Sequence, residues 1–248
     1  MAQVVNDGKT ANPNVLNLKE ITHGLLFLTF DDHDVVGWRK AIPFFAQNNV
    51  RATFSLSGVI DKEALECMKA LRGSGHTVGL HTLHHADAPE YIKTKGGAAY
   101  MKDEVKPQLD VCKKAGLAIS TFAFPNNKYD DASLELLSGK FCHFRVGCGL
   151  PRGSAVANFD KAFTPIAEFE GEKFFRGFGV GEYYSSRLDD LEAVLDRLAK
   201  NNEVATLYSH GIASCAKGVN MPLELLVPLV SHARSLGIVM AGLDDVPW

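Results

Sequence analysis

Residues 25–32 read Leu25-Leu26-Phe27-Leu28-Thr29-Phe30-Asp31-Asp32, an apolar run that ends in two adjacent aspartates. The apolar part is too short for a helix and follows Gly24, so we predict a buried strand over Leu25–Phe30. Two carboxylates side by side resist joint ionisation unless a cation compensates their charge. The alternative is that the acidic residues cap a helix beginning near Val35, a task for which Asp34 is better placed. The stretch therefore predicts a buried strand that delivers two carboxylates to its carboxyl end.

The same change from an apolar run to a polar loop recurs along the chain, with helical spacing of apolar residues in between. The predicted strands are Leu25–Phe30, Ala52–Leu56, Thr77–Leu80, Ile119–Phe124, Cys142–Val146, Val204–Tyr208 and Ile238–Ala241, with short ones around 162–168 and 173–179. The predicted helices cover 35–48, Lys62–Leu71, 99–114 with an interruption or a beginning near Pro107, Ala132–Leu137, 188–198 with Ser186 as its N-cap, and 223–236. Strands that alternate with helices imply a parallel sheet with right-handed crossovers. Seven or eight such units in 248 residues favour an α/β barrel, a single domain over residues 1–248 with an irregular lead-in at 1–20.

Composition and charge exclude several classes of protein. Lys and Arg number 26 against 29 Asp and Glu, a net charge of −3 that argues against a nucleic-acid partner. No apolar run approaches the ~18 residues of a membrane span, and no basic segment followed by an apolar one marks a signal peptide. The five cysteines contain no Cys-x-x-Cys pair, which fits a reducing compartment. We therefore expect a cytoplasmic protein, although a chain trimmed of its leader would have the same sequence. The sequence leaves the oligomeric state open.

Polar clusters follow four of the predicted strands. They are Asp31–Asp34, His81–His85, Pro125–Asn127 and Ser209–Gly211. The carboxyl ends of the strands of a parallel barrel all lie on one face, where barrel enzymes carry their active sites. We therefore expect these residues, which are far apart in the sequence, to meet at one site.

The second of these clusters contains two histidines four residues apart. On one helical turn, His81 and His85 would point their imidazoles in the same direction. Two neutral imidazoles and one carboxylate are a common ligand set for one divalent metal ion, and Asp31 or Asp32 would supply the carboxylate. The set favours zinc, and cobalt or nickel would fit it as well. His84 competes with His85 for the second histidine position, and a pair of surface histidines is the alternative to a metal site.

Three motifs together resemble a known family. Thr29-Phe30-Asp31-Asp32, His81-Thr82-x-x-His85 and Leu207-x-x-His210 are similar, in order and spacing over roughly 25–245, to motifs of the polysaccharide deacetylases, carbohydrate esterase family four. The resemblance implies a distorted (β/α)7 barrel and a metal-dependent enzyme that removes N-acetyl groups from an amino-sugar-containing saccharide. It implies the following roles: Asp31 as catalytic base, Asp32, His81 and His85 as metal ligands, His210 as general acid, and Leu207 as a wall of the pocket for the acetyl methyl group.

The third motif departs from the family. Ala123 stands where the family has an Arg that supports the catalytic aspartate, and Asn127 replaces a Gly. The second change is mild because Asn tolerates a positive φ. The loss of the Arg is not mild, so we expect a cation from a later strand to approach Asp31. Three later arginines are candidates: Arg145, Arg152 and Arg176. His33 also stands where the family has a Gly, and we expect it to be an exposed loop histidine.

The candidate substrate contacts come from the strand ends and from an aromatic segment. Beside Leu207, we expect Pro125, Arg176 and Tyr208 to contact the substrate. Seven aromatic residues could stack on sugar faces, although most of them would serve equally well to fill the interface between barrel and helices. They are Trp38, Phe174, Phe175, Phe178, Tyr183, Tyr184 and Trp248.

Three functions remain open on the sequence. The first is a metal-dependent carbohydrate deacetylase, a hydrolase acting on linear amide C–N bonds, which in the cytoplasm would serve surface-polysaccharide biosynthesis. The second is a metal-dependent hydrolase of a non-sugar, cyclic amide. The third is a catalytically inactive saccharide-binding relative, which the missing Arg permits. The presence of all five candidate catalytic and ligand residues favours an enzyme, and we expect the first function.

Overall fold

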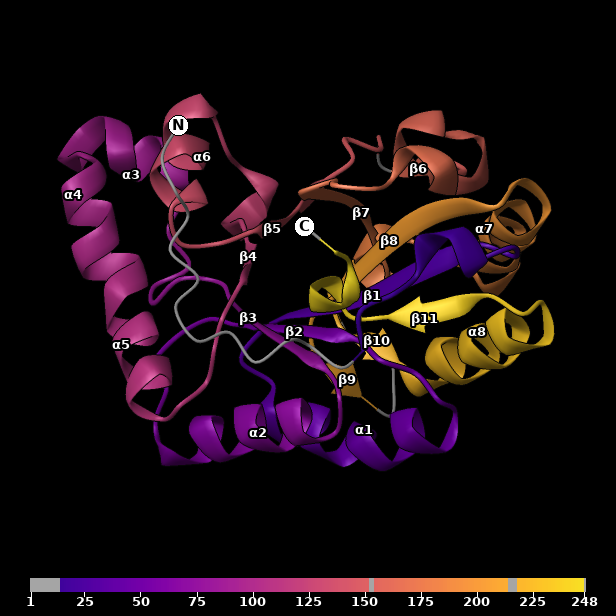
Figure 1. Cartoon of the computed structure of the whole chain (residues 1–248), viewed down its shortest axis with the longest axis horizontal. Helices are drawn as coiled ribbons and strands as arrows, with labels where there is room; N and C mark the ends of the chain where they lie inside the picture. The colour runs from indigo at the N-terminus through magenta and orange to yellow at the C-terminus, as the bar shows by residue number, and fades with distance from the viewer. Residues whose placement is uncertain (1–13, 152–153, 214–217, 248) are drawn as a thin grey trace.

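Seven parallel strands close into a barrel in this computed structural model, which describes residues 14–151, 154–213 and 218–247 (Figure 1). Neighbouring strands follow the chain order, and β8 pairs with β1 to close the ring. The barrel strands are β1 (Leu25–Asp32), β2 (Thr53–Leu56), β3 (Thr77–Leu80), β4 (Thr121–Ala123), β5 (His143–Gly147), β7 (Phe174–Gly179) and β8 (Glu203–Ser209). The α/β barrel expected from the alternation of strands and helices is confirmed.

The ring is irregular at two places. β1 pairs with β2 through Thr29–Asp32, whereas Leu25–Phe27 pair with an additional strand, β11 (Val239–Ala241). β3 and β4 meet at the single pair Leu80 and Phe122. Three short strands complete the described sheets: β6 (Phe163–Pro165), which runs antiparallel to β8, and the pair β9 (Ile212–Ala213) and β10 (Met221–Pro222). The barrel is therefore distorted, as the resemblance implies.

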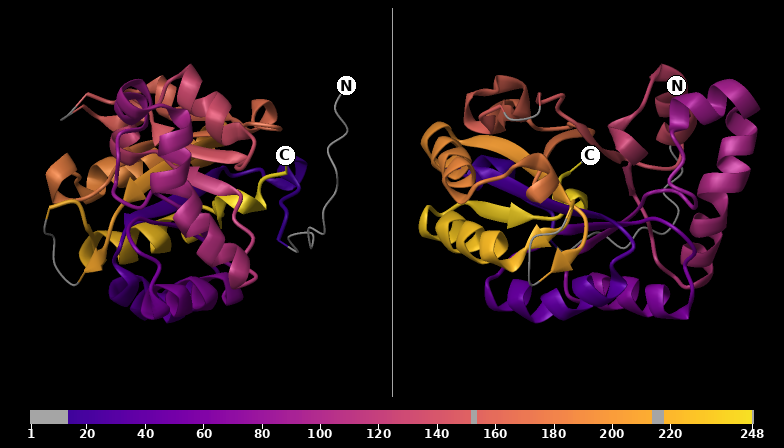
Figure 2. Two further views of the ribbon diagram at one scale, coloured as in Figure 1. Left: turned by 90° about the vertical axis from the view of Figure 1, so that its left-hand side faces the viewer. Right: turned by 180° about the vertical axis from the view of Figure 1, so that it is seen from behind.

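Helices surround the ring (Figures 1 and 2). Four of the helices begin at an aspartate whose side chain accepts a hydrogen bond from a backbone N–H group of the first turn, as expected for N-caps. These residues are Asp34, Asp61, Asp87 and Asp130. The helices are α1 (Val35–Gln47), α2 (Lys62–Gly73), α3 (Ala88–Lys95), α4 (Gly97–Tyr100), the π-helix η2 (Met101–Val105), α5 (Lys106–Lys114), α6 (Asp131–Ser138), α7 (Leu188–Asn201) and α8 (Leu223–Ser235). Single 3₁₀ turns lie at Leu18–Glu20, Pro125–Asn127, Val156–Asn158, Asp160–Ala162, Ile166–Glu168, Glu182–Tyr184 and Leu243–Asp245. No helix in the described ranges combines the length and the apolar character that crossing a membrane requires.

The structure differs from the sequence-based expectation in two helical segments. α3 was not predicted, because it buries only Ala88 and therefore shows no apolar stripe. The interruption expected near Pro107 in the 99–114 helix is present, because the π-helix η2 ends at Val105 and α5 begins at Lys106. Ser186 is not the N-cap of α7: that position is Arg187, and the Ser186 hydroxyl instead accepts a hydrogen bond from the Gly181 N–H. Residues 1–13 of the expected lead-in lie outside the described residues.

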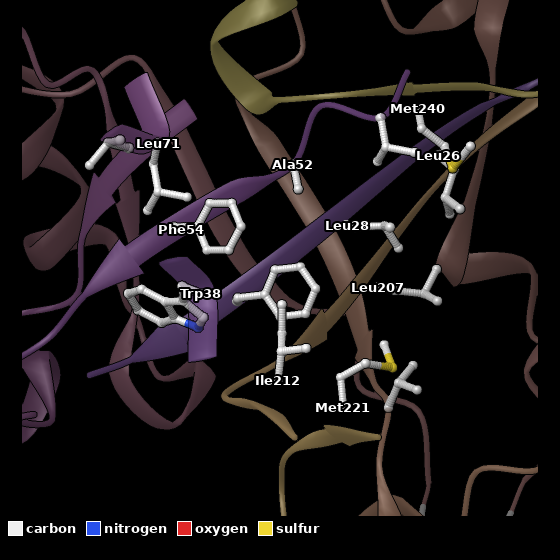
Figure 3. Close-up of a cluster of buried hydrophobic side chains, with 14 of the residues drawn as sticks. Leu26, Leu28, Trp38, Ala52, Phe54, Leu71, Leu207, Ile212, Met221 and Met240 are labelled. Carbon is white, nitrogen blue, oxygen red and sulfur yellow. The ribbon is translucent and has the colours of Figure 1, made fainter. Parts of the chain in front are cut away.

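Alternate residues of β1 face two different apolar clusters. The even-numbered apolar residues belong to the large cluster between the barrel wall and the helices, part of which Figure 3 shows. The odd-numbered ones belong, with Phe175 and Val204, to a smaller cluster inside the ring. Since strand side chains alternate between the two faces, Asp31 continues the inward series at the carboxyl end of β1.

A buried aspartate holds the opposite end of the ring together. Asp244 accepts hydrogen bonds from the hydroxyls of Ser120 and Thr121 and forms an ion pair with Arg72, with 3.0 Å between Nη1 and Oδ2. His143 Nδ1 lies 3.6 Å from its Oδ1. Burial alone would raise the pKa of Asp244, but these partners outweigh it and lower the pKa to about 2.

Candidate metal and catalytic site

Three potential metal ligands meet at the carboxyl ends of β1 and β3. Asp32, His81 and His85 each offer one ligand atom, and these atoms lie within 4.8 Å of one another. The Nε2 atoms of both histidines are 3.7 Å from Asp32 Oδ1. Ligands at about 2.1 Å around a tetrahedral ion would be separated by about 3.4 Å, so the cluster is already close to the spacing that an ion would need. It is the one His, Cys, Asp and Glu cluster of this kind in the described part of the chain.

The chemistry of the donors also suits a divalent metal. His81 is 1% exposed, and burial lowers the pKa of its imidazole to about 4, which keeps the ring neutral. Its Nδ1–H donates to the Ala123 carbonyl at 2.8 Å, so that the lone pair of Nε2 points towards Asp32. A histidine ligand typically has its other ring nitrogen tied in this way. The residues present therefore fit a metal of the kind that two imidazoles and one carboxylate bind.

The two histidines do not lie on a helical turn, which corrects the sequence-based expectation. Residues 81–87 form an irregular loop in which Thr82 and His85 have φ of 66° and 55°. Asp32 also has a positive φ, 77°. Such conformations cost about 1–3 kcal/mol each in non-glycine residues and persist where the surroundings enforce them, often at functional sites. The imidazoles converge because of this loop conformation, not because of a four-residue helical repeat.

Two other histidines of these motifs point elsewhere. The His84 Nδ1–H donates to Glu104 Oε1 at 2.9 Å, and His84 is absent from the ligand cluster. His33 is exposed, as expected, and its Nδ1 is 2.8 Å from the Ser57 carbonyl oxygen.

A cation from a later strand contacts Asp31, as the sequence predicts, and it is Arg145. Its Nη2 donates to Asp31 Oδ2, and the two side chains are 3% and 1% exposed. In the ladder between β4 and β5, Arg145 is the direct partner of Ala123, so the guanidinium enters the ring beside the position that lacks an Arg. Arg176 is half-exposed and pairs with Glu172, while Arg152 lies outside the described residues.

Arg145 is itself held by two polar side chains. It donates from Nη1 to Asn127 Oδ1, and its guanidinium lies 4.7 Å from the centre of the Tyr208 ring. Asn127 Nδ2 donates in turn to the Tyr208 hydroxyl at 3.1 Å. Asn127 has φ of 57°, the positive value that its replacement of a Gly anticipates. Asp31 Oδ1 has no hydrogen-bond partner among the described residues, so one oxygen of this buried carboxylate is left for another group.

His210 completes the cluster from β8. Its Nε2 lies 3.9 Å from Asp32 Oδ2, and its Nδ1–H donates to the Val219 carbonyl at 3.2 Å. Its own carbonyl accepts a hydrogen bond from Trp38 Nε1 at 2.9 Å. Asp31, His81, His85 and His210 thus surround the Asp32 carboxylate or adjoin it, at or just after the carboxyl ends of β1, β3 and β8.

A cavity of about 470 Å³ adjoins this centre and shares Asn127 and Tyr208 with it. Glycines on β5 and β7 make room for its walls. A Cβ at Gly147 would lie 3.0 Å from Asn127, one at Gly177 would lie 3.0 Å from Tyr208, and one at Gly179 would overlap the Tyr184 ring. Burial raises the pKa of Tyr184, which therefore stays a neutral phenol. Among the described lining residues are no Lys or Arg.

The remaining candidate substrate residues lie in different places. Tyr208 lines the cavity, but Leu207 is 1% exposed and packs in the outer apolar cluster near Ile212 and Met221 (Figure 3). Pro125 is also buried, and neither it nor Leu207 lines the cavity. Of the aromatic residues, Tyr183, Tyr184 and Phe178 line the cavity, Trp38 and Phe175 are buried, Phe174 is half-buried and Trp248 lies outside the described residues. The glycines at 147, 177 and 179 are the sequence signal for this cavity.

Comparison with known proteins agrees with this arrangement. Residues 19–139 match the model of the polysaccharide deacetylase family, a range that contains Asp31, Asp32, His81 and His85 but ends before Arg145 and His210. None of the curated proteins matches the chain.

Solved structures share the fold at low sequence identity. The chitin deacetylase of the fungal pathogen Colletotrichum lindemuthianum is 18% identical with a TM-score of 0.60, over 91% of this chain and 88% of that one. A family 4 carbohydrate esterase from Streptomyces lividans is 13% identical with a TM-score of 0.56, over 88% and 92%. A family 4 pseudoenzyme from Bacillus anthracis is 13% identical with a TM-score of 0.59, over 91% and 66%. With its barrel, its motifs and the match over residues 19–139, the chain is similar to the polysaccharide deacetylase family, whose fold it shares.

Proposed function

We propose that this protein is a metal-dependent hydrolase that removes N-acetyl groups from an amino-sugar-containing saccharide. The observation that carries the proposal is the buried ion pair between Arg145 and Asp31 beside the cluster of Asp32, His81 and His85. Arg145 places beside Asp31 the cation that the resemblance leads one to expect at position 123. A buried, unpaired charge is costly, so both partners need each other.

Each side chain of the centre has a defined task in this proposal. Asp32, His81 and His85 would hold a divalent metal, zinc by preference, which supplies Lewis acidity towards the substrate carbonyl. Arg145 holds Oδ2 of Asp31 and leaves Oδ1 without a described partner, so Oδ1 is the oxygen that would act as the base and take a proton from the attacking water.

His210 is the proposed general acid. The amide nitrogen must be protonated before it leaves, because an amide anion is a very poor leaving group. The carbonyl of Val219 accepts a hydrogen bond from the Nδ1–H of His210. The Nε2 of His210 is therefore the nitrogen that faces Asp32 and is available for proton transfer. The Trp38 indole fixes the backbone of His210 at the same time.

The adjoining cavity would receive the sugar. Tyr183, Tyr184 and Tyr208 offer aromatic faces and hydroxyls, which suit an uncharged polyhydroxylated ring. Its volume of about 470 Å³ lies in the usual range for a small-molecule site. Arg176, half-exposed on β7, would contact the substrate only outside this cavity.

We further propose a cytoplasmic substrate, for example an intermediate of surface-polysaccharide assembly. Cys67, Cys112 and Cys148 are buried and form no disulfide, and burial raises the pKa of Cys67 and Cys112 to about 11. Such thiols are unreactive and suit a reducing compartment.

Metal content and product analysis test the proposal together. We expect one divalent ion per chain in the wild type, its loss in a His81→Ala, His85→Ala double variant, and release of acetate with a free sugar amine from N-acetylated oligosaccharides. Ring opening of a cyclic amide without acetate release would instead assign the protein to non-sugar amide hydrolysis. Saccharide binding by the metal-loaded protein without turnover of either substrate would identify an inactive relative.

A further inference from the structure

The loop between the two histidine ligands is held by a buried carboxylate from outside the barrel. Glu104 is 2% exposed and lies in the π-helix η2 between α4 and α5. Its Oε2 accepts a hydrogen bond from the His84 backbone N–H at 2.8 Å, and its Oε1 accepts one from the His84 Nδ1–H at 2.9 Å. Its backbone carbonyl accepts from the Leu83 N–H at 2.9 Å. One residue thus makes three hydrogen bonds to the segment that separates His81 from His85.

The helix α5, which directly follows η2, also holds the loop after β2. Gln108, four residues further and 1% exposed, donates from Nε2 to the Gly58 carbonyl at 2.8 Å and to the Leu56 carbonyl at 3.2 Å. The loop after β2 in turn contacts both ligand strands. Its Ser57 N–H donates to the Asp32 carbonyl at 2.8 Å, and its Gly58 N–H donates to the Thr82 carbonyl at 3.0 Å. Glu104 and Gln108 therefore link the consecutive elements η2 and α5 to the two loops that carry or contact the three ligands.

This support matters because the ligand loop is strained. Thr82 and His85 keep positive φ values that isolated residues of their type avoid. A π-helix is rare and is often found at functional sites, and here it brings Glu104 within reach of the loop. Without the carboxylate, His84 would lose both of its hydrogen bonds to Glu104, and only the backbone bond between Leu83 and Glu104 would remain of the three.

We propose that Glu104 is a positioning residue that sets the metal affinity of Asp32, His81 and His85 by fixing the loop between the histidines. The proposal rests on the metal site of the proposed function, but it concerns a residue outside the site and is measured by metal binding alone. Changes to groups that orient metal ligands typically reduce metal affinity about 10–100-fold.

The test titrates metal-free protein with Zn²⁺ against a chromogenic chelator and records the visible spectrum of the Co²⁺-loaded protein. We expect Glu104→Ala to weaken Zn²⁺ binding about 10–100-fold and to alter the Co²⁺ bands. Glu104→Gln keeps an acceptor for the His84 N–H and should recover part of the affinity. The matched control is Asp103→Ala, because Asp103 lies on the same π-turn but accepts a hydrogen bond from Tyr91 instead.

Each outcome decides the matter. Wild-type affinity and spectrum in Glu104→Ala would overturn the proposal, as would an equal loss in Asp103→Ala. If Glu104→Ala does not fold, Glu104→Gln decides: intermediate affinity with changed Co²⁺ bands supports the proposal, and wild-type behaviour overturns it. If the wild type itself binds no metal, the proposed function fails as well, and that failure is seen before any variant is compared.

Discussion

Replacing Arg145 by Met should both destabilise the protein and remove its activity. Methionine retains most of the length of the side chain and removes the charge, so Asp31 is left as a buried carboxylate without a partner. Both side chains are at most 3% exposed, which puts the pair in the class where removing one partner costs about 3–5 kcal/mol in the free energy of unfolding. The loss should be at the lower end if a bound metal compensates part of the Asp31 charge.

The matched control is Arg176→Met on the neighbouring strand. Its side chain is 46% exposed and lies 3.9 Å from Glu172, so its loss should change the unfolding free energy by no more than about 1 kcal/mol. Urea unfolding of the metal-free variants measures both values. Single-turnover acetate release measures the second effect, for which we expect a loss of about 10²-fold or more in Arg145→Met, since Asp31 is no longer held.

A double variant that moves the guanidinium from position 145 to position 123 tests the same assignment. Ala123 is the register partner of Arg145 and is fully buried, so Arg145→Ala combined with Ala123→Arg moves the guanidinium to the adjacent strand. The double variant should recover part of the activity that Arg145→Ala loses. Unchanged stability and unchanged acetate release in Arg145→Met would refute the assignment of Arg145 as the support of Asp31.

Two further predictions concern Asp244, at the end of the ring opposite the site, and the cavity. The pKa of Asp244 is lowered from 3.8 to about 2, so its carboxylate contributes about 2 kcal/mol to the free energy of unfolding at neutral pH. The difference in unfolding free energy between wild type and Asp244→Asn should therefore stay constant above about pH 5. It should shrink as the pH falls from 4 to 2, because the carboxylate becomes protonated. A difference that does not vary with pH would exclude this origin. Gly179→Ala should displace the Tyr184 ring and raise KM for saccharides without weakening metal binding, whereas Gly139→Ala, where a Cβ meets nothing within 4 Å, should leave KM unchanged. Equal KM values in these two variants would argue against a sugar in the cavity.

The sequence predicts the barrel and most of the candidate centre because both depend on local signals. Short apolar runs that end in polar clusters mark the strands of a parallel sheet, and the geometry of a barrel collects their carboxyl ends. Asp32, His81 and His85 were therefore predicted to meet, and the structure brings them within 4.8 Å.

The parts that the sequence did not resolve depend on register and on distant partners. Arg145 was one of three candidates, and it is singled out by its pairing with Ala123, which no local pattern encodes. Strand alternation could have excluded Arg176, because Phe175 beside it faces the interior of the ring. The histidine loop is irregular and is hydrogen-bonded to Glu104, 20 residues from His84, so a helical repeat was the wrong model for it.

Single-turnover acetate release from an N-acetylglucosamine oligomer tests the central claim most directly. We predict acetate from the zinc-loaded wild type, and rates lower by about 10²–10⁴-fold in His210→Asn and Asp31→Asn with metal content unchanged. No acetate from a wild type that holds its metal and binds the oligomer would contradict the claim, as would variants that release acetate as fast as the wild type.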